Sequence, residues 1–97
     1  MFDKMKQLMD MKKQADQIKK ELDAMTTVCD AIRGIKITIT GSQKVQAVEI
    51  EERFLDPNNK SRFEQELQRA INQAIAKSQN LAAQKMRTMM PDGFPGL

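Results

Sequence analysis

The 97-residue chain contains no histidine and a single cysteine, Cys29. Without histidine, neither a Ser-His-Asp nor a Cys-His nucleophile system can be built, and ordinary zinc sites lose a principal ligand. One cysteine forms no internal disulfide and no cysteine-based metal cluster. Because the chain also has no glycine-rich phosphate loop, we expect no enzyme activity, no catalytic residues, no metal site, no cofactor and no small-molecule substrate.

Large aromatic side chains and long apolar runs are also scarce. The chain has no tryptophan, no tyrosine and four phenylalanines, whereas proteins that bind single strands stack bases on aromatic rings. This composition argues against recognition of single strands and RNA loops. No stretch approaches the roughly 18 apolar residues of a membrane span, and residues 1–4 begin a charged helix rather than a signal peptide. We therefore expect a cytoplasmic protein without a membrane partner.

What the sequence does contain is a clear β-hairpin. Isoleucine alternates with polar residues at period two over residues 35–40, which predicts a strand with one buried face. Gly41, Ser42 and Gln43 supply a turn, and residues 45–51 return as a second strand. The β-formers of residues 26–31 predict a further strand before the hairpin. Together they predict a three-stranded antiparallel sheet.

Two helices are predicted on either side of this sheet, over residues 2–25 and 60–90. The first carries apolar residues at heptad spacing from Leu8 to Met25, and the second carries a broad apolar stripe at 3.6-residue period. Asn58 or Asn59 is the expected cap of the second helix. Residues 91–97 form a short tail rich in proline and glycine. The fold class is thus α+β, in a single domain over residues 1–97.

The helices are too long for the sheet that they flank. At 1.5 Å per residue they extend roughly 36 and 46 Å, while a strand of six residues spans about 20 Å. Apolar stripes that continue past a sheet usually mark association surfaces. We therefore predict an intertwined, tweezer-like homodimer. Its interface is expected to include Leu8, Met11, Ile18, Ile37, Ile39, Leu81 and Met86.

Positive charge collects on one side of the first helix. The chain has 16 basic and 13 acidic residues, a net charge of +3, and five lysines of the first helix fall on heptad positions e and f. From sequence alone, a solvated helix face is the more common explanation of this pattern, but rows of lysine also suit phosphate groups. The end of the second helix is basic as well. The candidate DNA contacts are Lys6, Lys12, Lys13, Lys19, Lys20, Lys77, Lys85 and Arg87.

Four short segments carry a resemblance that covers essentially the whole chain. They are Met11-Lys12-Lys13-Gln14-Ala15, the run from Ile35 to Gly41, Val48-Glu49-Ile50, and Pro91-Asp92-Gly93-Phe94. In this order and spacing they resemble the YbaB/EbfC family of bacterial nucleoid-associated proteins. The family usually has a glycine-rich link where this chain has residues 30–34, and Asp-Pro where it has Glu51-Glu52.

The resemblance implies a tweezer-shaped dimer that binds duplex DNA with little sequence preference and influences nucleoid organisation or gene expression. A nucleoid location and two partners follow from it, double-stranded DNA and a second copy of the chain. Another hypothesis needs no DNA: the methionine-rich helices could make a helical adaptor or chaperone-like dimer that binds partner proteins. Substitution of Lys6, Lys13 and Lys20 by glutamine would separate the two, because only DNA binding depends on these lysines.

Overall fold

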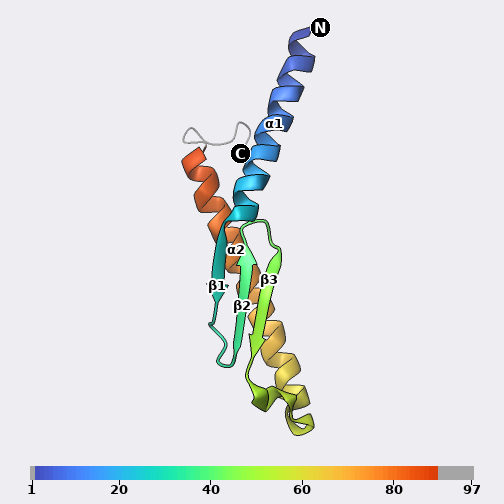
Figure 1. Ribbon diagram of the computed structural model, residues 1–97, viewed down its shortest axis with the longest axis vertical. Coiled ribbons are helices and arrows are strands. Elements are labelled where there is room, and N and C mark those ends of the chain that lie inside the picture. Colours follow the sequence, from blue (N-terminus) through green and yellow to red (C-terminus); the bar gives the residue numbers. More distant parts are fainter. Residues whose placement is uncertain (1, 90–97) are drawn as a thin grey trace.

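A helix, three antiparallel strands and a second long helix follow one another along the chain (Figure 1). The computed structural model describes residues 2–89, without the side chains of Phe2 and Met89. This order confirms the predicted α+β fold, while the homodimer stays a prediction. The elements are α1 (Phe2–Ala24), β1 (Thr26–Cys29), β2 (Ile35–Thr40), β3 (Val45–Ile50), the 3-10 helices η1 (Glu52–Leu55) and η2 (Pro57–Asn59), and α2 (Lys60–Met89).

The strand bounds differ from the predicted ones mainly in β1. This strand ends at Cys29 and not at residue 31, because the chain turns there toward Gly34, whose φ of +92° suits glycine. The bounds of β2 agree with the prediction, and β3 ends one residue earlier. The tail predicted over residues 91–97 lies outside the described residues.

The three strands form one antiparallel sheet in the order β1-β2-β3. Ile37 on the central strand lies opposite Cys29 on β1 and Val48 on β3. An irregularity in the pairing of β2 with β3 falls between Thr38 and Ile39. Residues directly opposite each other share a face of the sheet. Val45, Val48 and Ile50 of β3 therefore lie on the same face as the isoleucines of β2.

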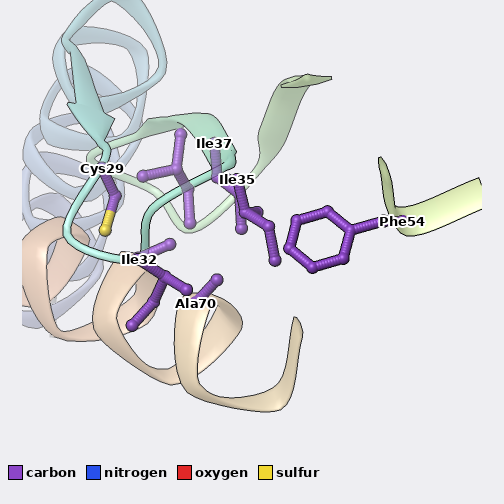
Figure 2. Packing of buried hydrophobic residues seen from close by; sticks show 8 residues of the cluster. Cys29, Ile32, Ile35, Ile37, Phe54 and Ala70 are labelled. Atoms are coloured by element: carbon purple, nitrogen blue, oxygen red, sulfur yellow. The ribbon is translucent and has the colours of Figure 1, made fainter. Parts of the chain in front are cut away.

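The core lies between this face and α2. Ile35, Ile37 and Ile39 are each 2% exposed or less, as the period-two pattern predicted. Figure 2 shows the Ile35 and Ile37 side chains on the side of the sheet that faces α2, where Ala70 is labelled. Small residues recur every four positions on α2, at Ala70, Ala74 and Ser78, and all are buried. Because they are small, the helix can lie close against the large isoleucines.

One buried polar contact accompanies this packing. The hydroxyl of Ser78, fully buried, donates a hydrogen bond to the backbone oxygen of Thr40 at 2.7 Å. A buried hydroxyl without a partner would be costly. The bond therefore fixes the end of β2 to the middle of α2, on the side of the molecule where α1 joins the sheet.

The connection from β3 to α2 contains two 3-10 helices that were not predicted. Asp56 accepts a hydrogen bond from the backbone N–H of Asn58 at 3.0 Å and caps η2. Asn59 directly precedes α2, and its side-chain amide donates to the backbone oxygen of Arg53 at 2.7 Å. Phe54 is buried, and its ring stacks on Phe63 with centroids 5.0 Å apart. These contacts close the end of the core.

The molecule is long, with extents of 66 × 21 × 20 Å. In Figure 1 the N-terminal half of α1 projects well beyond the sheet, at the end toward which α2 runs. The loop between β1 and β2, η1, η2 and the start of α2 lie at the opposite end. The overhang of both helices is thus as predicted, and we call the projecting part of α1 (residues 2–17) the arm.

Candidate nucleic-acid interface

Five lysines of α1 lie in the outer surface of the molecule. Lys6, Lys13 and Lys20 follow one another at seven-residue intervals, about 10 Å along the helix, and Lys12 and Lys19 flank them. All five are exposed. Over residues 2–89, no carboxylate lies within ion-pair distance of any of them. Their ammonium groups are therefore available to an anionic partner.

The acids of α1 leave this positive surface intact. Asp3, Asp10 and Asp16 precede lysines at helical spacing, yet none of the three forms an ion pair within the described part of the chain. Along the whole of α1 there are six lysines and five acids, because Glu21 and Asp23 follow these three aspartates. No helix among residues 2–89 is long and apolar enough to cross a membrane.

The three candidate cations on α2 have different surroundings. Lys77 donates a hydrogen bond from Nζ to the backbone oxygen of Val28 at 2.8 Å, on the outer side of β1. Lys85 Nζ lies 3.7 Å from the Glu21 carboxylate, which joins α2 to α1. Arg87 is exposed, and within residues 2–89 it has no such contact. The structure thus gives Lys77 and Lys85 contacts inside the protomer, which sequence reasoning did not foresee.

The residues predicted at a dimer interface fall into three groups. Leu8 and Met11 are exposed, at 66% and 65%. Ile37 and Ile39 are buried in the protomer's own core, so their side chains offer no surface to a partner. The remaining three are partly buried in the protomer, at positions Ile18, Leu81 and Met86.

An apolar surface on β3 was not among the predicted interface residues. Val45, Val48 and Ile50 are 57%, 53% and 37% exposed, and they lie opposite Ile39, Ile37 and Ile35 on the core face of the sheet. The sequence pattern alone places Val48 and Ile50 on one face of β3. The structure adds that α2 covers β1 and β2 and leaves this face of β3 open. We call these three side chains the β3 patch.

A polar joint anchors α1 to the hairpin. The backbone N–H of Gly41 lies 3.1 Å from the oxygen of Leu22 and 2.9 Å from that of Met25, at the end of the helix. A Cβ at Gly41 would lie 3.2 Å from Leu22, so the hairpin turn approaches the helix closely. The Ser42 hydroxyl donates to the Asp23 carboxylate, and Lys44 lies 3.5 Å from it. The joint thereby sets the direction of the lysine-bearing arm.

The Asp23 carboxyl should titrate below its ordinary pKa of 3.8. The hydrogen bond from Ser42 has the largest effect and lowers the pKa, and Lys44 and Lys19 lower it further against the opposing effect of desolvation. Because the pKa of Asp23 is lower in the folded than in the unfolded state, its carboxylate stabilises the fold at pH values above the unfolded-state pKa. This stabilisation is lost as the pH falls through the folded-state pKa. We expect Ser42→Ala to move the pKa of Asp23 back toward 3.8, as measured by NMR of the carboxyl carbon.

The matched control is Ser61→Ala, an exposed serine on α2, which should leave the titration of Asp23 unchanged. A wild-type midpoint at or above 3.8 would contradict the role of Ser42.

Comparison with known proteins adds one match. The model of the YbaB/EbfC DNA-binding family matches residues 1–94 of the 97-residue chain. No curated protein matches the chain. The family match covers both helices and the sheet, so it includes every candidate DNA contact described above.

Proposed function

The chain belongs to the YbaB/EbfC DNA-binding family, a bacterial family of nucleoid-associated proteins, and we propose that it binds duplex DNA as a homodimer through phosphate contacts. The exposed lysines of α1 make most of these contacts, and Arg87 of α2 adds to them. Lysine contacts phosphate as a point charge and carries little sequence information. Binding is therefore weakly selective for sequence, and it affects nucleoid organisation or gene expression in the cytoplasm.

The unpaired lysine surface on α1 is the observation that carries this proposal. An exposed lysine that is already paired with a carboxylate must give up that partner to reach phosphate, whereas these five form no ion pair within residues 2–89. Release of counterions from DNA then supplies the driving force.

The aromatic residues support a duplex rather than a single strand. Phe54 is buried, and Phe63 stacks on it and is partly buried, so neither ring presents a face to a base. Proteins that bind single strands rely on exposed aromatic rings on which the bases stack. A mobility shift that compares a random duplex with one of its single strands tests the proposal. We expect a shift with the duplex and a much weaker one with the single strand. Equal affinity for both would contradict it.

Three features support the homodimer. The β3 patch leaves three apolar side chains partly exposed beside α2, and Leu8 and Met11 leave the apolar stripe of the arm exposed. The outer backbone edge of β3 pairs with no other strand in residues 2–89. By contrast, Lys77 already occupies a backbone oxygen of β1. An open apolar edge is a template for association, so we place β3 and the exposed stripe of α1 in the interface.

Val48→Asp should convert the dimer into a folded monomer. Val48 is 53% exposed in the protomer, so the fold tolerates a carboxylate there, whereas an interface would have to bury that charge at a cost of several kcal/mol, on the order of a hundredfold or more in affinity. Sedimentation velocity at several protein concentrations measures the effect.

Ala47→Asp is the control for this experiment, since it places the same charge on the opposite face of β3. It should leave the dimer intact. A wild-type protein that sediments as a monomer at micromolar concentration, or a Val48→Asp variant that dimerises normally, would contradict the proposed interface.

The exposed methionines of the arm favour a second candidate function. Met5, Met9 and Met11 are all more than 60% exposed, and flexible methionine surfaces can bind varied partner helices. In this alternative the protein is a helical adaptor or chaperone-like dimer. The lysines separate the two functions, because their loss should abolish DNA binding and leave a bound partner protein in place.

A further inference from the structure

Three arginines surround a hollow at the end of the molecule opposite the arm. Arg33 comes from the loop between β1 and β2, Arg53 from η1, and Arg62 from the first turn of α2. The hollow has a volume of about 330 Å³, and Glu51 and Glu66 complete its lining. We call it the arginine hollow. In Figure 1 its elements lie at the foot of the molecule, while α1 projects from the top.

Arg53 is held firmly in the lining. Its Nε donates to the Glu51 carboxylate at 2.7 Å, its Nη2 donates to the backbone oxygen of Arg33 at 2.9 Å, and its guanidinium lies 4.2 Å from the centre of the Phe54 ring. Gly34 makes room for it, since a Cβ there would lie 2.6 Å from Arg53 Nη2. Of the five guanidinium N–H groups, these two bonds leave three for a ligand.

The two acids of the hollow already have partners, while two of the arginines form no ion pair with the described part of the chain. Glu51 pairs with Arg53, and Glu66 lies 3.9 Å from Arg69 on the next turn of α2. Neither Arg33 nor Arg62 has a carboxylate of residues 2–89 within ion-pair distance. The guanidinium groups of Arg33 and Arg62 therefore line the hollow without an ion-pair partner among residues 2–89, beside the fixed guanidinium of Arg53.

Convergent guanidinium groups bind phosphate in particular. Their planar forks donate two parallel hydrogen bonds to phosphate oxygens, and fixing Arg53 in advance reduces the entropy lost on binding. The hollow is open, polar and lined by charge, so an apolar ligand gains little there. Its ligand class is thus a phosphate or phosphodiester.

We propose that the arginine hollow holds the backbone of a second DNA segment, so that the protein joins two duplexes. This rests on the proposed function, in which the lysines of α1 hold the first. The hollow and the arm lie toward opposite ends of the molecule, whose longest extent is 66 Å. On the elements between them, Asp23 and Glu49 pair with Lys44 and Lys36. Exposed lysines at one end of the molecule and three exposed arginines at the other are suited to two separate duplexes.

The test is a two-DNA capture experiment, in which full-length protein must retain a labelled random duplex on beads that carry another. We expect wild-type protein to retain it, and Arg33→Gln/Arg62→Gln to retain about tenfold less, the loss expected when one or two charge-assisted hydrogen bonds disappear. Affinity for a single short duplex, measured by mobility shift, should not change. Arg53 is kept, because it supports the fold.

Lys36→Gln/Lys60→Gln is the matched control. It removes the same charge from two exposed lysines that pair with Glu49 and Glu64 and do not line the hollow. It should capture DNA as the wild type does, and thermal unfolding should confirm that both variants fold.

Each other outcome overturns the inference in a recognisable way. Unchanged capture by the arginine variant shows that the hollow does not hold DNA. A loss of short-duplex affinity in the same variant shows that the hollow contacts the first duplex. If wild-type protein shifts a duplex but captures no second one, the joining of two duplexes is refuted and the binding of a single duplex is not. If wild-type protein shifts no duplex at all, the proposed function is refuted as well. Binding of inorganic phosphate without capture, followed by NMR of the arginine Nε–Hε groups, identifies the hollow as a site for free phosphate only.

Discussion

Replacing Lys6, Lys13 and Lys20 together by glutamine should weaken the binding of duplex DNA by on the order of a hundredfold near physiological salt. Glutamine keeps the helix propensity and much of the length of lysine but removes the charge. The three side chains are exposed and lie at seven-residue intervals on α1, so the substitutions remove a row of phosphate contacts without disturbing the core.

The salt dependence of binding identifies the mechanism behind this loss. Each phosphate contact contributes about 0.9 to the slope of log affinity against log salt, so the triple variant should lower that slope by about 3 for each protomer bound. Fluorescence anisotropy with a labelled random duplex at several salt concentrations measures both affinity and slope.

A second triple variant, with three cations placed elsewhere, serves as the control. Lys36, Lys60 and Arg69 pair with Glu49, Glu64 and Glu66 on the body of the protein. Replacing them by glutamine removes the same net charge and should reduce affinity far less. If the two triple variants lose affinity equally, overall charge rather than the lysine surface of α1 controls binding.

Ile37→Ala should lower the free energy of unfolding by about 2–5 kcal/mol. Ile37 is 2% exposed in the middle of the central strand, and the structure around such a site relaxes only partly when the side chain is shortened. The variant therefore loses both the transfer free energy of the side chain and the contacts around the resulting cavity.

Urea unfolding at a fixed protomer concentration measures this loss, since dimerisation would otherwise shift the midpoint. Leu55→Ala is the control, because Leu55 is 71% exposed and should change the free energy by less than about 0.5 kcal/mol. A loss below about 1 kcal/mol for Ile37→Ala would show that the face of β2 is not the core.

The strand β2 could be predicted from sequence because its pattern reflects one physical constraint. Alternate residues of a half-buried strand must be apolar, and Ile35, Ile37 and Ile39 satisfy this rule without exception. The helices followed from their own periodicity in the same way. These patterns are local, so no knowledge of the tertiary contacts was needed.

The partner of each apolar face could not be predicted in the same way. The pattern shows that Ile37 is buried, but not whether α2 of the same chain or a second copy covers it. The structure gives it to α2, whose Ala70, Ala74 and Ser78 allow close approach. The 3-10 helices η1 and η2 were not predicted, because Asp56, Asn58 and Asn59 are all good caps and the local sequence does not show which helix each of them starts.

The candidate site was predictable to a similar degree. Lysines on α1 were assigned from heptad position alone, and their exposure agrees with that assignment. Lys77 and Lys85 were grouped with them by charge, but they contact Val28 and Glu21. Contacts between residues 49 and 64 positions apart in sequence leave no local pattern. The arginine hollow could not be predicted for the same reason, because its three arginines come together only in the folded chain.

The affinity for two duplexes of unrelated sequence, measured from low to physiological salt, tests the central claim most directly. Phosphate contacts by lysine predict that both affinities fall steeply and in parallel as salt rises, since counterion release drives binding to either duplex. An affinity that does not change over this range, or that differs strongly between the two sequences, would contradict binding through phosphate.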